Sequence, residues 1–204
     1  MKNDLDEPVH LVEYDPNWTE LFREESGRLR TLAPFILAAE HFGSTAIQGM
    51  AAKPIIDILI GVKELPVAAH DIEQLQQAGY ESLGEAGVPG RSYFRKRGIH
   101  NFNLAVVVFG GHHWKDNLLF RDYLRSNPAA AAEYEREKRR SVAHGATMLL
   151  AYSQAKGDCI SRLLARAPAS GRLPFRRQRS SMSYAIPGFT SLLPANYTSC
   201  FAAA

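Results

Sequence analysis

Cysteine and long apolar runs are both scarce in this sequence of 204 residues. Its two cysteines, Cys159 and Cys200, lie far apart and outside any Cys/His cluster, so neither a disulfide framework nor a zinc site is expected. No apolar run approaches the ~18–20 residues of a membrane-spanning helix, and the acidic segment 1–15 lacks the apolar stretch of a signal peptide. We therefore expect a cytoplasmic protein with no role at a membrane.

Acidic residues are absent from residues 168–204, which hold four arginines. Without these four, 20 basic residues face 21 acidic ones, so residues 1–167 carry a net charge of −1 although the whole chain carries +3. A body without excess positive charge is not expected to bind nucleic acid specifically. Scattered Pro, Ser and Gly without periodicity predict a flexible or foreign extension over 168–204, after a single domain over 1–167.

The segment His41–Val62, HFGSTAIQGMAAKPIIDILIGV, combines a Gly-Ser turn with an apolar run that contains one acid. Gly43 permits a close backbone approach, and Ser44 can offer its hydroxyl and N–H to a phosphate at the start of a short helical segment. Isoleucine and leucine on both sides of Asp57 predict a buried strand of an α/β sheet, in which hydrophobicity does not alternate.

Asp57 is costly inside such a strand unless it is paired, binds a cation or reaches a cleft at the strand end. In one interpretation, a helix N-terminus or a neighbour such as Lys53 satisfies the carboxylate, which then serves only the fold. In the other interpretation, Asp57 is a metal ligand near the Gly-Ser turn. His41, which directly precedes the turn region, either orients the turn or touches a ligand.

Three features together resemble one protein family. They are the pattern H-x-G-S-T-A-x-x-G-x-A-A-K-P-I-I-D-I, the sequence FRDYLR at Phe120–Arg125, and two Tyr-x-x-x-Lys spacings downstream. From about Val12 to Leu164 the chain is similar to the GrpB family. The resemblance implies a nucleotidyltransferase-like α/β (α+β) fold, with a mixed sheet flanked by helices and a C-terminal helical segment. Some relatives carry this domain joined to dephospho-CoA kinase, which implies a protein partner as an alternative role.

The resemblance also bears on catalysis. Active nucleotidyltransferases pair a Gly-Ser turn with Asp-x-Asp or Asp-x-Glu on a strand, and a later strand supplies a third acid. Gly43, Ser44 and Asp57 match the first part of this pattern. The match implies a catalytic and metal-binding role for Asp57, with Mg²⁺ as the cofactor.

The remaining acids of that pattern are missing. Leu59 stands where the second acid is expected, and the later strand, Asn101–Val107, contains no acid. Asp57 with Asn103 as a neutral oxygen donor offers ligands for a single Mg²⁺, whereas two-metal transfer needs several carboxylates. Enzyme activity therefore stays open, and ordinary nucleotide transfer is not expected.

Basic residues elsewhere are candidates for binding the phosphate groups of a ligand. RSYFRKR at Arg91–Arg97 is typical of an edge strand whose charges either block aggregation or clamp phosphate, with Arg95 as the candidate. The two Tyr-x-x-x-Lys pairs, which end at Lys138 and Lys156, place each lysine either over its ring or near an anion beside the turn. The candidate ligand-binding residues are Gly43, Ser44, Thr45, Lys53, Arg95, Asn103, Arg121 and Lys138.

Three functions fit these residues. The first is binding of a nucleotide or another phosphorylated small molecule, in which the turn holds phosphate, Asp57 holds Mg²⁺ and Arg95 or Lys138 balances charge. The second is a non-catalytic accessory domain that binds a protein partner and supports its folding, in which Asp57 serves only the fold. The third, a transferase acting on a small acceptor, rests on analogy with other proteins of the fold, and the missing second acid opposes it.

Overall fold

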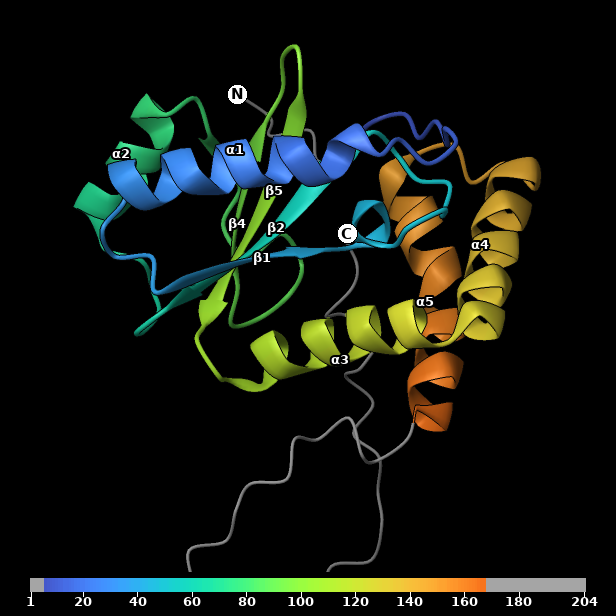
Figure 1. Ribbon diagram of the computed structural model, residues 1–204. Coiled ribbons are helices and arrows are strands. Elements are labelled where there is room, and N and C mark those ends of the chain that lie inside the picture. Colours follow the sequence, from blue (N-terminus) through green and yellow to red (C-terminus); the bar gives the residue numbers. More distant parts are fainter. Residues whose placement is uncertain (1–5, 168–204) are drawn as a thin grey trace, which may run out of the picture.

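A mixed sheet of five strands forms the centre of the protein, and helices cover both of its faces (Figure 1). The structure is a computed structural model that describes residues 6–167, so the extension expected over 168–204, with Cys200, lies outside the described residues. The strands are β1 (Ala38–Phe42), β2 (Ile55–Val62), β3 (Glu81–Ser82), β4 (Ser92–Lys96) and β5 (Asn101–Val108). The helices are α1 (Asn17–Leu32), the 3-10 helix η1 (Ser44–Ala46), α2 (Ala69–Gln77), α3 (His112–Ser126), α4 (Pro128–Ala143) and α5 (Leu149–Arg166).

The strand order is β1-β2-β5-β4-β3, in which β2 and β5 are parallel and the other neighbours are antiparallel. All eight residues of β2 are buried. Because helices cover both faces of the sheet, apolar residues of β2 need not alternate with polar ones. The predicted buried strand around Asp57 is therefore confirmed, and so is the mixed sheet with C-terminal helices.

The two faces of the sheet carry separate apolar cores. On the face that α1 covers, Ile56 and Ile58 of β2 belong to the larger core. On the opposite face, which α3 covers, Leu59 belongs to one cluster with Trp114. Asp57 shares this second face, because residues two positions apart on a strand point the same way.

Helices α4 and α5 pack against each other beyond the η1 end of β1 (Figure 1). Ile47 and Met50, from the loop after η1, share a core with Phe120 of α3, Tyr134 of α4 and Ile160 of α5. The Gly-Ser turn therefore lies where the sheet, α3 and the C-terminal helices meet. Within residues 6–167, no helix combines the length and apolar character needed to cross a membrane.

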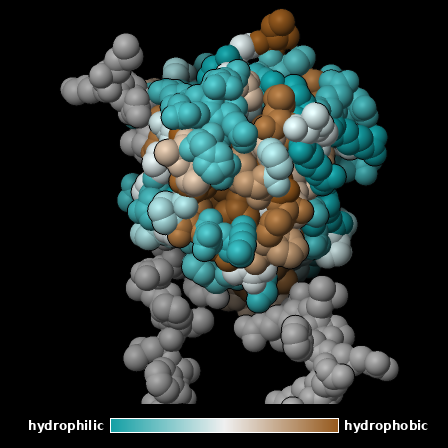
Figure 2. Space-filling model, turned by 90° about the vertical axis from the view of Figure 1, so that its left-hand side faces the viewer, coloured by the Kyte–Doolittle hydropathy of each residue, from teal (hydrophilic) through white to brown (hydrophobic). Residues whose placement is uncertain are grey.

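The end of the sheet away from α4 and α5 exposes apolar side chains (Figure 2). The N–H of Leu37 donates to the carbonyl of Gly61, and the N–H of Phe109 donates to that of Val62, so both residues flank the end of β2. Leu37 is 59% exposed, Phe109 is 50% exposed and Val108 is 39% exposed. We call these three side chains the β2-end patch, because an exposed apolar patch can mark a contact with another protein.

Candidate functional site

Asp57 is only 3% exposed and therefore lies inside the protein, not at the rim of a cleft. Asn103, its register partner on β5, donates from Nδ2 to Asp57 Oδ1 at 2.7 Å. The other end of that amide, Asn103 Oδ1, accepts from Arg97 Nη2 at 3.0 Å, and Arg97 forms an ion pair with Glu7 at 2.7 Å. The Asn103 amide is thus fixed from both sides and presents its donor to the carboxylate.

Gly43 brings the Gly-Ser turn directly against the Asp57 carboxylate. The φ of +71° and ψ of −171° at Gly43 belong to a region of backbone conformation that is essentially restricted to glycine. A Cβ at this position would overlap Asp57 Oδ2 and would lie 3.1 Å from Asp57 Cγ. The turn approaches the carboxylate this closely because residue 43 has no side chain.

Two buried lysines, Lys53 and Lys156, act electrostatically on Asp57, and a third, Lys138, acts on Lys156 and is itself affected by Lys53. Lys53 precedes β2, Lys138 lies on α4 and Lys156 lies on α5, and their exposed fractions are 8%, 0% and 1%. Lys138 Nζ donates to the Ala51 carbonyl at 2.5 Å, whereas Lys53 Nζ has no hydrogen-bond partner among the described residues. We call Lys53, Asp57, Lys138 and Lys156 the buried charge cluster.

Aromatic rings line the same cluster. Lys138 Nζ lies 5.1 Å from the ring centre of Tyr134, and Lys156 Nζ lies 5.0 Å from that of Tyr152. Lys53 Nζ is 6.0 Å from the Tyr152 ring. Each Tyr-x-x-x-Lys pair therefore packs internally, and both of its members face the interior, which the spacing alone left open.

Burial is the largest influence on the pKa values of the buried charge cluster. Burial raises the pKa of Asp57, while Lys53, the Asn103 hydrogen bond and Lys156 act in the opposite direction. Burial also lowers the pKa of Lys53 and Lys156, and it lowers the pKa of Lys138 to about 7. A negative charge that entered the cluster would favour the charged amines and so would draw protons to them.

Positive charge exceeds negative charge around Asp57 when all groups are ionised. Lys53, Lys156 and Arg97 all act electrostatically on the Asp57 carboxylate. Arg97 is already paired with Glu7. Two buried amines therefore share one carboxylate, and a buried charge without a partner is costly.

The groups around Asp57 do not fit Mg²⁺. This ion takes oxygen ligands in a near-octahedral arrangement. Asp57 instead faces the cationic Lys53 and Lys156 and the N–H of Asn103, whose oxygen is occupied by Arg97. Within residues 6–167, no group of three or more His, Cys, Asp or Glu could hold a metal ion. The geometry therefore gives no support to Asp57 and Asn103 as Mg²⁺ ligands.

The positions where further acids would be needed are apolar and packed. Leu59 and Ala105 are register partners on β2 and β5. Both are buried in one cluster with Phe42 and Trp114. Two-metal phosphoryl transfer needs carboxylates to neutralise the developing charge, and neither of these two positions supplies one beside Asp57.

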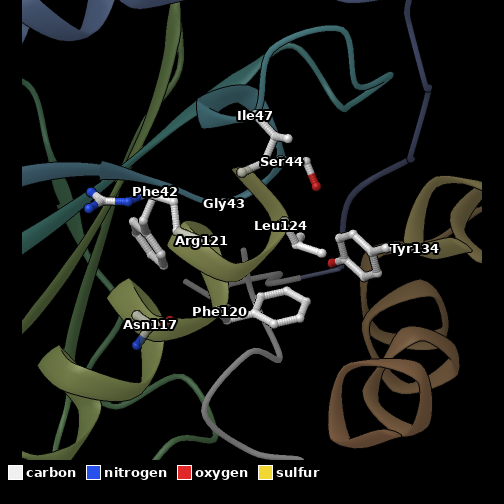
Figure 3. A pocket seen from close by; sticks show the side chains of 9 residues that line it. All are labelled: Phe42, Gly43, Ser44, Ile47, Asn117, Phe120, Arg121, Leu124 and Tyr134. Atoms are coloured by element: carbon white, nitrogen blue, oxygen red, sulfur yellow. The ribbon is translucent and has the colours of Figure 1, made fainter. Parts of the chain in front are cut away.

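A small cleft lies next to the Gly-Ser turn, between β1, η1, α3 and α4 (Figure 3). Its volume is about 20 Å³, which is room for about one water molecule. The hydroxyls of Ser44 and Tyr134 are hydrogen-bonded to each other at its wall. Phe120, Arg121 and Leu124, all from the FRDYLR sequence, line the α3 side. That motif thus builds one wall of the cleft.

Two arginines of α3 hold the backbone on both sides of the turn. Arg121 donates to the His41 carbonyl at 3.1 Å and forms an ion pair with Glu40 at 2.7 Å, and its guanidinium points away from the cleft (Figure 3). Arg125 donates to the Ala46 carbonyl at 3.0 Å. Arg121, a candidate for phosphate binding, is therefore placed where it positions the turn.

Thr45 and His41 also orient the turn. Thr45 is 2% exposed, and its Oγ1 lies 3.0 Å from His41 Nε2 and donates to the Ile55 carbonyl at 3.4 Å. Burial, with added effects of Arg125 and Arg121, lowers the pKa of His41 to about 3. His41 is therefore neutral at physiological pH and links the turn to β1 as a hydrogen-bonding group.

The side chains of Arg95 and Arg97 contact different residues. Arg95 is the register partner of Asn103 on β4, but its Nε pairs with Glu81 at 2.7 Å. Arg97, one residue beyond β4, is the arginine that contacts the Asn103 amide. Sequence reasoning passed over Arg97, although its even spacing from Arg95 puts both on one face of an extended strand.

The lowered pKa of Lys138 predicts an unusual pH dependence of stability. Its pKa falls from 10.5 to about 7 on folding, so the unfolded chain binds more protons between these values. The free energy of unfolding should therefore rise with pH above about 7, by up to about 1.4 kcal/mol per pH unit for each such lysine. Urea unfolding at pH 7, 8 and 9 measures this slope. Lys138→Met should reduce the slope by the share of this one lysine, because Lys53 and Lys156 remain, whereas Lys63→Met, at an exposed lysine, should leave it unchanged.

The described residues form an α+β protein with buried lysines and one buried carboxylate, Asp57, beside the Gly-Ser turn. The apolar Leu59 and Ala105 occupy the positions where further acids would be needed. Residues 8–166 match the GrpB protein family, and the chain belongs to this family. It is 40% identical over 138 residues to the glutamate-rich protein GrpB of Alkalihalophilus pseudofirmus, covering 64% of this chain and 79% of that protein. The crystal structure of GrpB from Enterococcus faecalis matches with a TM-score of 0.65 and 32% identity, over 76% of this chain and 98% of that one.

Two other relatives are longer than the shared region. The UPF0157 protein YqkA of Bacillus subtilis is 39% identical over 154 residues, which are 74% of this chain and 45% of YqkA. A dephospho-CoA kinase of Mycolicibacterium paratuberculosis is 31% identical over 159 residues, which are 65% of this chain and 39% of the kinase. The chain thus spans less than half the length of either relative.

A further structural match has a lower TM-score than the GrpB structure. A cytoplasmic RNA terminal U-transferase aligns with a TM-score of 0.43 and 14% identity over 71% of this chain and 48% of that one. A likeness at this level carries no argument about ligand or reaction.

Proposed function

We propose that this GrpB family protein binds a phosphate-bearing small molecule, such as a nucleotide, through its buried charge cluster. The observation that carries the proposal is Lys53 Nζ, a buried amine without a hydrogen-bond partner among the described residues. It lies in the electrostatic field of Asp57, which it shares with Lys156. A phosphate group would supply both the acceptor that Lys53 lacks and the missing negative charge.

The neighbouring turn gives such a ligand a route out of the cluster. Tyr134 forms a common wall, because its ring lies beneath Lys138 Nζ and its hydroxyl is hydrogen-bonded to Ser44. A ligand whose phosphate is held by Lys53 and Lys156 would therefore extend past Gly43 and Ser44 into the cleft. In this arrangement Asp57 keeps the lysines in place and does not hold a metal, and any Mg²⁺ would be brought by the ligand's own phosphates.

The site is closed in this structure. The cleft of about 20 Å³ is too small for a phosphate group, and α5 carries Lys156 over the cluster. Binding thus requires the C-terminal helices to move away from the sheet. A closed, water-poor site strengthens electrostatic binding once the ligand is inside.

Calorimetric titration with ATP and with inorganic triphosphate, each with Mg²⁺ and with EDTA, tests the proposal. We expect both compounds to bind in EDTA, because the lysines and not a metal hold the phosphate. Binding should also be tighter at pH 6.5 than at pH 9, because the amines take up protons when the anion enters. Failure of inorganic triphosphate to bind would refute the proposal, and binding that requires Mg²⁺ would favour Asp57 as a metal ligand.

A second candidate function is an accessory domain that binds a protein partner and supports its folding. The β2-end patch favours it, as does the similarity to part of a dephospho-CoA kinase. Under this alternative, a separately expressed dephospho-CoA kinase would bind the protein and refold with a higher yield in its presence. Replacing Leu37 and Phe109 with Glu would abolish both effects, and no phosphate compound would change the melting temperature.

A further inference from the structure

Asn117 on α3 has an unpaired polar atom inside the protein. The residue is 5% exposed, and its Nδ2 donates to the His113 carbonyl at 2.7 Å. Its Oδ1 is buried and has no hydrogen-bond partner among the described residues. A buried acceptor left without a donor costs about 1–3 kcal/mol, and such atoms are few in native proteins. The atom therefore requires an explanation.

Asn117 lines the same cleft as the Gly-Ser turn (Figure 3). The other polar groups there have partners, since Ser44 and Tyr134 are hydrogen-bonded to each other and Arg121 pairs with Glu40. The remaining side chains of the lining are apolar, two aromatic and two aliphatic: Phe42, Phe120, Ile47 and Leu124. Ligand sites are typically lined by apolar side chains, with a small number of placed polar groups that fix the orientation of the ligand.

We propose that the cleft selects the non-phosphate part of the ligand, and that Asn117 Oδ1 accepts a hydrogen bond from an amino group on a nucleotide base. This inference rests on the proposed function, because the phosphate held by the lysines is what aligns the ligand with the cleft. The cleft, with its volume of about 20 Å³, has room for the amino group alone. The base ring that carries this amino group enters the cleft when α3 and α4 separate. A site with a buried acceptor rejects analogues that lack the donor, because the acceptor stays unpaired.

Two ligand pairs test the inference on the unchanged protein, by calorimetric titration in EDTA. ATP is compared with purine riboside triphosphate, which lacks the amino group, and CTP is compared with UTP. In at least one pair we expect the amino compound to bind ten-fold or more tightly. Equal affinities within both pairs would overturn the inference even if inorganic triphosphate binds, and failure of inorganic triphosphate would overturn the proposed function and the inference together.

Asn117→Leu provides the matching test on the protein side. Leucine removes the unpaired oxygen while keeping most of the volume, so we expect a melting temperature at or above that of the wild type. The preference for the amino compound should disappear, so that the two affinities within a pair become about equal. The affinity for inorganic triphosphate should stay unchanged. A preference that persists in this variant would contradict the role of Asn117. A parallel loss of triphosphate binding would likewise contradict it, because Asn117 would then serve the phosphate site or the fold.

Discussion

Replacing Gly43 with alanine is expected to lower the free energy of unfolding by about 3–5 kcal/mol. Two costs add at this position. The backbone conformation, with φ of +71° and ψ of −171°, is one that residues with a side chain rarely adopt. The added methyl group would overlap Asp57 Oδ2, and Asp57 is held on its other side by Asn103. Urea denaturation measures the loss.

Gly49→Ala is the matched control for this prediction. Gly49 also has a positive φ, of +77°, but a Cβ there would have no atom within 4 Å. We expect a loss of about 1–2 kcal/mol from backbone strain alone. Equal losses in the two variants would show that the turn does not press against the carboxylate. In the Asp57→Ala background, part of the cost of Gly43→Ala should disappear.

Asp57→Asn is expected to lower the free energy of unfolding by about 3 kcal/mol at pH 7. The change keeps the shape of the side chain but removes the negative charge that Lys53 and Lys156 share. Removing that charge leaves the buried amines without electrostatic compensation. Because the variant cluster carries a larger positive excess, inorganic phosphate should raise its melting temperature more than that of the wild type.

The control for Asp57→Asn is Asp122→Asn. Asp122 forms an ion pair with Arg121 at 2.7 Å, but its side chain is 59% exposed. Such a pair contributes about 0–1 kcal/mol, so the variant should be nearly as stable as the wild type. If Asp57→Asn instead abolished the response to phosphate, the carboxylate would act as a ligand through a bridging metal ion, contrary to the present account.

The sequence predicted the parts of the site that depend on local patterns. The apolar run around Asp57 predicted a buried strand, and β2 is that strand. Gly43 and Ser44 predicted a turn that opens a short helical segment, which is η1. These features rest on neighbouring residues and on the steric freedom of glycine, so they can be derived without knowing the tertiary structure.

The contacts between distant elements could not be predicted in the same way. The spacing of Tyr134 and Lys138 shows that they share a helical face, but not that this face packs against Ala51 and the cluster. The even spacing of Arg95 and Arg97 puts both on one face of a strand, but it does not show which of them contacts Asn103 and which pairs with Glu81. The two spacings left open whether each lysine lies over its ring or near an anion beside the turn. Lys138 and Lys156 are both buried.

The metal prediction depended on a similar unknown. Asn103 was considered as an oxygen donor, and its position beside Asp57 in the register fits that expectation. The side-chain amide, however, can present either its oxygen or its N–H. Arg97 takes the oxygen, so the N–H faces the carboxylate and the pair is unsuited to a cation. A single arginine from beyond the end of β4 thus fixes which end of the Asn103 amide faces Asp57.

The most direct test of an anion site at the buried charge cluster is the melting temperature with and without inorganic triphosphate in EDTA. It should be measured for the wild type, Lys53→Met and Lys63→Met. We expect triphosphate to stabilise the wild type and Lys63→Met equally. Lys53→Met should start from a higher melting temperature, because it replaces an unpaired buried amine with an apolar side chain, and it should not respond. A wild type without any response, or a Lys53→Met variant that responds like the wild type, would contradict the account.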